Sequence, residues 1–448
     1  MTQDSIISDC SAGFTVGVVL VAQGVAYGLL TGLPAYYGLY AGLLPSLIYA
    51  AFGTSRQMHI GPFALISMLV ADGAHTAVHP RDFVTLFDPH PSCHEHMSNS
   101  TPAQIIKGES ADNLFCLAYI DACMTMSMMV GAMFLFMWVF KLGFVVEFMS
   151  DSMIRGMTTA AAVLICTSQM KHVLGITIDR GSFANTWETI FKESDQINYV
   201  AVAIAVSSLV IQLVIERMNK KHKWKVPIPS QLVVVVLMTA VVAIGGLGVS
   251  ETHTDGVTIL GDVPSGLPSP YFPNLKYAKD LVQGALIVGV VSLSLCTATV
   301  KTFADKNNYE IVPEQELFAL GLANLLGGMW RCYPPSSSLS RSALADSIGS
   351  KTPAWNLVSC SVIVLVRAFC QSYRRVRGAS SCVLLFVCCF FFSFQQILPP
   401  FSHGSRSQVL MLLTSALRQL PNACLATIIF MAFVKLLKQV RPSLPRKV

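Results

Sequence analysis

Long apolar stretches recur along this chain of 448 residues, separated by shorter polar segments. Two clear examples are YVAVAIAVSSLVIQLVI, from Tyr199, and QLVVVVLMTAVVAIGGLGV, from Gln231. Each is close to the ~20 residues that a helix needs to cross a bilayer. A bilayer core gives the backbone no hydrogen-bonding partner, so helices are the default spanning form, and the alternating polarity typical of barrel strands is missing. The pattern therefore predicts an all-α polytopic membrane protein.

The apolar stretches predict a series of membrane spans. They lie near residues 12–33, 36–54, 61–78, 113–140, 152–171, 199–216, 230–248, 280–300, 316–331, 336–350, 355–366 and 409–434. The first begins near Ser11 without a basic leader, which favours a retained span over a signal peptide.

Composition supports this prediction and limits the chemistry. The chain is 53% hydrophobic and 12% charged, against roughly 25% charged in soluble domains. Its net charge of +6 does not indicate a nucleic-acid partner. The thirteen cysteines form no C-x-x-C pair and are interpreted as buried apolar side chains, and the histidines of HPSCHEH, 90–96, match no metal-ligand spacing. No metal, no cofactor and no catalytic residue are predicted.

The basic residues predict the topology. The segment ERMNKKHKWK, 216–225, contains five Lys or Arg, and such loops face the cytoplasm. Counting crossings from it places 79–112, 172–198 and 249–279 outside. The sequon Asn99-Ser100-Thr101 lies in the first of these outer loops, so we predict glycosylation at Asn99. We expect the chain to cross the membrane many times and to be located in the plasma membrane.

Two spans are interrupted by proline. Gly61-Pro62 breaks the third span, and Pro334-Pro335 precedes the serine-rich segment SSSLSRSAL. Each break predicts a short extended segment that leads into a half-helix. Irregular backbone inside a membrane needs surrounding protein or a cavity, and the N-terminus of a helix attracts anions. The two breaks therefore predict an interior anion site.

Arg341 adds a full positive charge to the second half-helix. An arginine at that depth costs at least ~2.5 kcal/mol on insertion scales, which favours a functional role. Two structural alternatives remain open: the side chain reaches the membrane interface, or it forms an ion pair with Asp346.

Two blocks of sequence resemble the SulP family, the sulfate-permease-type anion transporters of the prestin and pendrin family. The first block, from Ala22 to Ser67, has the motifs Gln23-Gly24-x-Ala26-Tyr27, Tyr37-Gly38-Leu39-Tyr40, Gly53-Thr54-Ser55-Arg56 and Gly61-Pro62-Phe63. The second block, from Asn307, ends in Ser338-x-Ser340-Arg341. The resemblance covers most of the chain from Ser11 to Val366 and resumes near Arg418.

The resemblance implies a transporter fold of seven plus seven spans in inverted repeats, with a core domain, a gate domain and two half-helices. It implies an anion site between spans three and ten, formed by Gln23, Tyr27, Phe63, Ser338, Ser340 and Arg341. The implied function is secondary transport of sulfate, chloride, bicarbonate, oxalate or a similar anion by alternating access. Small anions and membrane lipid are the expected partners, and a homodimer is the expected assembly.

Some members of the family carry a carboxylate in span eight for proton coupling. Residues 281–304 contain none, which favours exchange or uniport.

The chain departs from the family pattern in its C-terminal part. Spans one to eleven occupy 1–366, a segment without resemblance occupies 367–408, and the last recognisable span and a tail occupy 409–448. The apolar run Cys382–Phe394 is too short to span a membrane. This segment is either a re-entrant loop or, as we prefer, translated non-coding sequence. We expect the gate repeat to be incomplete and the STAS domain of the family to be absent.

Several other functions are weighed against transport. A nucleobase permease would need acidic residues at the half-helices, where this chain has arginine and serines. An intramembrane serine hydrolase would need a histidine base within a span, and the nearest candidates, His75 and His172, lie at span ends. Two further alternatives remain. One is a voltage sensor or motor that anions gate but that transports no anion, and the other is an inactive truncated product.

Overall fold

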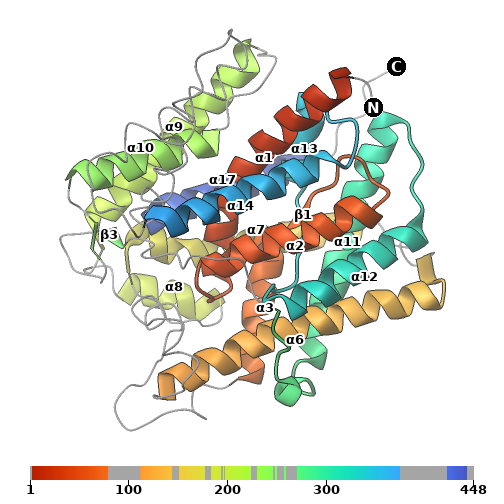
Figure 1. Cartoon of the computed structure of the whole chain (residues 1–448). Helices are drawn as coiled ribbons and strands as arrows, with labels where there is room; N and C mark the ends of the chain where they lie inside the picture. The colour runs from red at the N-terminus through yellow and green to blue at the C-terminus, as the bar shows by residue number, and fades with distance from the viewer. Residues whose placement is uncertain are drawn as a thin grey trace. The chain divides into compact units, whose positions relative to one another are not determined.

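The structure is a computed structural model that describes residues 3–78, 111–143, 151–176, 183–192, 195, 197–222, 230–245, 248–249, 257–258, 270–373 and 421–440. The chain divides into two compact units. The first unit combines Met1–Ser150 with Gly266–Val364, and the second combines Asp151–Ser265 with Leu365–Val448. Helices dominate both units (Figure 1). This confirms the all-α prediction.

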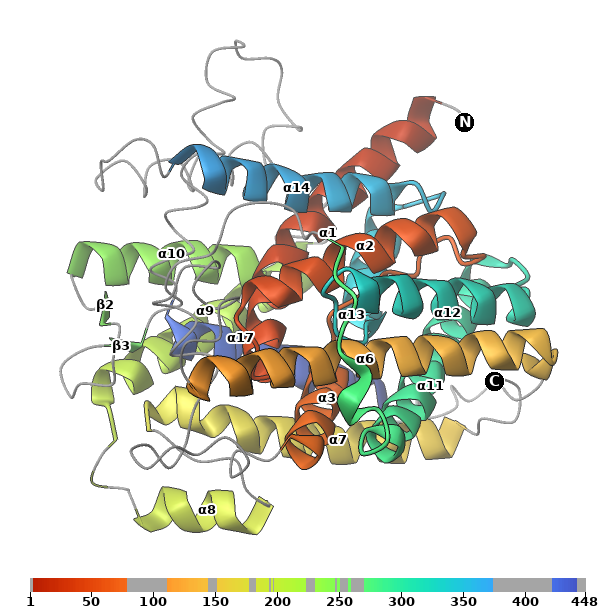
Figure 2. The same ribbon diagram turned by 60° about the horizontal axis from the view of Figure 1, so that its bottom comes forward.

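The first unit contains the two broken spans, and helices that are distant in sequence surround them. Its helices are α1 (Gln3–Leu30), α2 (Tyr36–Phe52), α3 (Ala64–Ala77), α6 (Ala111–Val139), α11 (Val282–Asn307), α12 (Pro313–Met329), α13 (Leu339–Ile348) and the first part of α14 (Trp355–Tyr373), with the 3₁₀ turn η4 (Leu275–Tyr277) before α11. The long helices α6 and α12 lie side by side in both views (Figure 2). Two strands of two residues each, β1 (Ile60–Gly61) and β4 (Ser336–Ser337), precede α3 and α13.

The second unit consists of helices and one small strand pair. Its helices are α7 (Asp151–Leu174), α8 (Phe183–Lys192), α9 (Tyr199–His222), α10 (Ser230–Gly245) and α17 (Asn422–Val440). The strands β2 (Gly248–Val249) and β3 (Val257–Thr258) pair in parallel. A hydrogen bond of 3.2 Å from Gln212 Nε2 to Thr427 Oγ1 joins α9 to α17.

Four of the described helices are long and apolar enough to cross a membrane. These segments are Ser8–Leu30, Phe115–Val139, Tyr199–Asn219 and Val282–Asn307. On α11, Val282, Leu286, Ile287 and Val290 are each about half exposed, and their spacing places them on one face of the helix. A row of large exposed aliphatic side chains is typical of a surface that contacts lipid.

The pairing of α1 with α2 explains two of the sequence motifs. A Cβ atom built on Gly38 would lie 1.8 Å from the carbonyl oxygen of Gly24, so the two backbones meet where neither residue has a side chain. Close contact through small residues is a common way for helices to pack in membranes. This contact fixes α1, which carries Gln23 and Tyr27, against α2.

The ends of several predicted elements differ from the observed ones. Helix α14 continues to Tyr373, beyond the expected end at 366, and α17 continues to Val440, beyond the expected end at 434. Residues 409–420, Asn99, the HPSCHEH segment and Cys382–Phe394 lie outside the described residues.

Candidate functional site

The two proline breaks meet at one point in the first unit. Strands β1 and β4 are antiparallel, with Ile60 opposite Ser337 and Gly61 opposite Ser336. The backbone N–H of Ser338 extends this pairing by donating to the carbonyl of His59 at 3.2 Å. The predicted extended segments are therefore present, and they also pair with each other, which the sequence did not indicate.

Each strand passes directly into a short helix. Phe63 is extended, with φ −141° and ψ 133°, and forms the N-cap of α3 without a capping side-chain hydrogen bond. The first N–H groups of a helix have no partner inside it, so the start of α3 presents backbone donors. Ser338 is the N-cap of α13, and its hydroxyl accepts the backbone N–H of Arg341 at 3.5 Å.

The side chain of Arg341 is fully buried and lies between these two helix starts. Its Nη1 donates to Oε1 of Gln23 on α1 at 2.8 Å, and its Nη2 donates to the carbonyl of Pro62 at 2.9 Å. Its Nε donates to Nδ1 of His59 at 3.2 Å. A guanidinium has five N–H groups. These three bonds leave two of them without a partner among the described residues.

All three acceptors around Arg341 are neutral groups. Asp346, the acid suggested by the sequence, instead accepts from Lys306 Nζ and from Asn307 Nδ2, the latter at 2.9 Å. The ion pair between Arg341 and Asp346 is therefore not formed. Full burial also rules out an arginine that reaches the interface. Within the described part of the chain, Arg341 makes no salt bridge and keeps its whole positive charge.

The predicted site residues are related to Arg341 in different ways. Gln23 and Ser338 bond to Arg341, and the hydroxyl of Ser338 lies 3.2 Å from that of Ser340. Tyr27 is buried one turn after Gln23 on α1. Phe63 follows Pro62 directly and is half-buried.

Two residues of this region were missed by the sequence analysis. His59 is fully buried and bonds to Arg341. Tyr333 is fully buried just before Pro334-Pro335 and accepts from Ser67 Oγ on α3 at 3.3 Å. The signal for His59 was its place two residues before the Gly61-Pro62 break. The residue precedes the third predicted span, 61–78, rather than lying within it.

The segment that leads to β1 is held by the start of α14. Trp355 Nε1 donates to the carbonyl of Arg56 at 2.9 Å, and Asn356 Nδ2 donates to that of Met58 at 3.1 Å. The Trp355 ring also packs against His59, with ring centroids 5.6 Å apart. Two carbonyls of the irregular backbone before α3 are therefore satisfied by side chains of α14.

The buried carboxylate of Glu316 fixes the other end of this segment. Its Oε1 accepts the backbone N–H of Thr54 at 2.8 Å and that of Ser55 at 3.1 Å, and also the hydroxyl of Thr54. The hydroxyl of Tyr49 lies 2.9 Å from Oε2. This network ties α12 to the Gly53-Thr54-Ser55-Arg56 motif and limits movement of the chain before β1.

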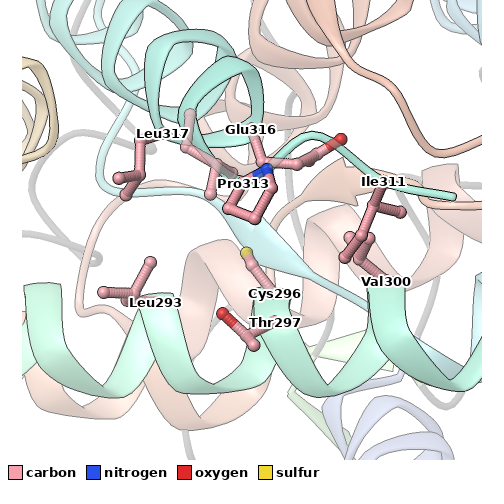
Figure 3. Close-up of a pocket in the computed structure, with 9 residues that line it drawn as sticks. Leu293, Cys296, Thr297, Val300, Ile311, Pro313, Glu316 and Leu317 are labelled. Atoms are coloured by element: carbon pink, nitrogen blue, oxygen red, sulfur yellow. The ribbon is translucent and has the colours of Figure 1, made fainter. Parts of the chain in front are cut away.

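A small pocket lies next to this site, between α11 and α12. Figure 3 shows Leu293, Cys296, Thr297 and Val300 of α11 facing Pro313 and Leu317 of α12. Its lining is mostly apolar and includes none of the predicted anion-site residues. The sulfur of Cys296 lies 3.7 Å from the hydroxyl of Ser336, so the α11 side of the pocket contacts β4.

Comparison with known proteins identifies the family. The model of the sulfate permease family matches residues 6–375, which is most of the chain. The chain belongs to the sulfate permease family. This is a family of transporters and not of enzymes.

Individual relatives match over a similar region. Human solute carrier family 26 member 6 is 31% identical over 371 residues, which are 81% of this chain and 45% of that protein. Prestin from Danio rerio is 28% identical over 370 residues, which are 81% of this chain and 47% of that protein. This chain spans about half the length of the curated relatives it matches.

Solved structures share the fold. A murine anion transporter of the solute carrier 26 family in the inward-facing state has a TM-score of 0.76 at 25% identity, covering 99% of this chain and 62% of that one. The transmembrane domain of a cyanobacterium bicarbonate transporter has a TM-score of 0.69 at 17% identity, covering 98% of this chain and 90% of that domain. The protein is therefore a multi-pass membrane protein with an all-helical transporter fold.

Proposed function

We propose that the protein is a secondary anion transporter whose anion binds at the starts of α3 and α13. The observation that carries this proposal is Arg341, a buried guanidinium bonded only to neutral groups and with two N–H groups left over among the described residues. A buried charge is costly unless it is paired. A mobile anion supplies the missing charge.

The site residues have different roles in this proposal. Arg341 provides the charge, and the backbone N–H groups at the start of α3 add the positive end of a helix dipole. Ser338 and Ser340 provide hydroxyls, while Phe63 and Tyr27 form walls that exclude water. Gln23 directs its carbonyl oxygen at Arg341, so we assign it to the orientation of the guanidinium rather than to direct anion contact.

The proposed mechanism is alternating access in an inverted-repeat fold. We assign the first unit to the core domain, because it contains the whole candidate site, and the second unit to the gate domain.

Residues 282–304 of α11 contain no carboxylate, which supports exchange or uniport over proton symport. Sulfate, chloride, bicarbonate and oxalate are the proposed substrates, and the names of a human sulfate anion transporter and a cyanobacterium bicarbonate transporter support the first and third. A homodimer in the plasma membrane completes the proposal.

The test is anion-dependent thermal stabilisation of the purified full chain, followed by tracer uptake into vesicles. Sulfate, chloride, bicarbonate and oxalate are titrated against wild type, Arg341→Gln and Asp346→Asn. We expect Arg341→Gln to weaken binding tenfold to a few hundredfold, as for the loss of one charged hydrogen-bonding partner. Asp346→Asn is the matched control, because it changes the charge of the same helix outside the site.

Three results would contradict the proposal in different ways. Unchanged anion affinity in Arg341→Gln would remove Arg341 from the site. A wild type that binds none of the four anions would remove the site itself. Binding with voltage-dependent charge movement but without tracer flux would instead support the anion-gated voltage sensor.

A further inference from the structure

The histidine beside Arg341 has a bonding pattern that packing alone does not explain. The Nε of Arg341 carries a hydrogen, so Nδ1 of His59 must accept it with a lone pair. The neutral ring then has its own proton on Nε2, and that buried atom has no hydrogen-bond partner among the described residues. An unpaired buried donor is destabilising. An apolar ring would fill the same space against Trp355 without this cost, so the nitrogen at Nδ1 has a separate role.

The position of His59 is fixed on every side that the structure describes. Its backbone N–H donates to Ser342 Oγ at 3.1 Å, and its carbonyl accepts from the backbone N–H of Ser338 at 3.2 Å. Its ring packs against Trp355. A side chain held in this way can in turn hold the group that it contacts, because its own rotamer is locked by packing and backbone bonds.

The charge of the acceptor is as important as its position. A carboxylate at the place of Nδ1 would orient the guanidinium equally well, but it would also neutralise the charge that attracts an anion. The three acceptors that Arg341 has are an amide oxygen, a backbone carbonyl and an imidazole nitrogen. They fix the guanidinium plane and leave its charge available.

We propose that His59 is a positioning residue for anion binding: its Nδ1 holds the Nε edge of Arg341, so that the two unbonded N–H groups keep a fixed direction. This inference rests on the proposed function, since it requires Arg341 to bind the anion. His59 itself acts through Arg341. It selects one rotamer of the arginine before the anion arrives, which lowers the entropy lost on binding.

Two substitutions separate the acceptor from the ring. His59→Asn keeps an acceptor oxygen near the place of Nδ1 and loses the ring, while His59→Phe keeps a ring against Trp355 and loses the acceptor. We expect His59→Phe to weaken sulfate or chloride binding roughly tenfold to a hundredfold and His59→Asn to restore most of it. His59→Leu is a smaller variant without an acceptor, and it should bind like His59→Phe.

The experiment is thermal stabilisation by sulfate and by chloride, with the melting temperature without anion measured for each variant. His59→Phe is also made in the Arg341→Gln background. A residue that acts through Arg341 should cause little further loss there, whereas an independent structural role would give additive losses. In transport assays we expect a higher half-saturating concentration with a maximal rate within about twofold of wild type.

The outcomes distinguish this inference from the proposed function. If Arg341→Gln binds anions like wild type, the proposed function fails. If Arg341→Gln is weakened but His59→Phe and His59→Leu bind like wild type, the positioning role fails and the anion site remains. If His59→Asn is as weak as His59→Phe, or the losses are additive, His59 is a packing residue only.

Discussion

The guanidinium of Arg341 donates to the amide oxygen of Gln23 at 2.8 Å, and the two residues lie 318 positions apart in the sequence. This bond connects the first helix of the chain to the second half-helix. It also determines which end of the Gln23 amide faces the site, because only the oxygen can accept from a guanidinium. The amide dipole therefore holds Arg341 without cancelling its charge.

The first prediction tests this neutrality. Gln23→Glu places a carboxylate next to Nη1 of Arg341, so the two side chains form an ion pair and the carboxylate competes with the anion. We expect anion affinity to fall by roughly tenfold or more. Without anion, the variant should be at least as stable as wild type, because the new carboxylate pairs with the buried guanidinium. Thermal stabilisation by sulfate and chloride measures both quantities.

Gln23→Met is the matched control for that experiment. It removes the acceptor without adding charge, so its loss of affinity should be smaller than that of Gln23→Glu. If Gln23→Glu bound anions as tightly as wild type, the positive charge of Arg341 would not be what attracts them.

The second prediction concerns the carboxylate that ties α12 to the chain before β1. Glu316→Gln keeps the shape of the side chain, but its NH₂ group meets donors from Thr54, Ser55 or Tyr49. We expect a loss of stability of about 2 to 3 kcal/mol, because at least one buried donor loses its acceptor. Glu310→Gln is the control, since Glu310 is exposed in the connection that precedes α12. Equal melting temperatures for the two variants would contradict a structural role for Glu316.

The sequence predicted the parts of this site that depend on local rules. Proline removes a backbone donor and restricts the residue before it, so Pro62 and Pro335 indicated the extended segments and the half-helices after them. The cost of a buried charge indicated that Arg341 has a role. These inferences need only the neighbours of each residue along the chain.

The other parts of the site depend on contacts between distant residues. The pairing of Gly61 with Ser336 and the bond from Arg341 to His59 join segments more than 270 positions apart. Sequence pattern gives no register for strands of two residues, since so short a strand has no visible periodicity. The sequence likewise left the partner of Asp346 open, because it does not place Lys306 beside it.

The third prediction uses the contact between α1 and α2. Gly38→Ala would place a Cβ atom 1.8 Å from the carbonyl oxygen of Gly24, so the two helices must separate. We expect a loss of roughly 1 to 3 kcal/mol and weaker anion binding, since α1 carries Gln23. Gly156→Ala is the control, because a Cβ atom there meets nothing within 4 Å, and alanine in a helix should stabilise by about 0.5 to 1 kcal/mol. A Gly38→Ala protein that melts like wild type would contradict the close packing of these helices.

The fourth prediction concerns the coupling of transport. Helix α11 has no carboxylate in residues 282–304, so no acid in that stretch can carry a proton with the anion. Labelled sulfate should enter vesicles preloaded with unlabelled anion faster than it enters vesicles without internal anion. Collapsing the proton gradient at constant voltage should leave this uptake rate unchanged. Uptake that stops without the proton gradient would contradict exchange and uniport. His59 is the buried titratable group bonded to Arg341, so His59→Asn, which cannot take up a proton, would then show whether the coupling depends on this residue.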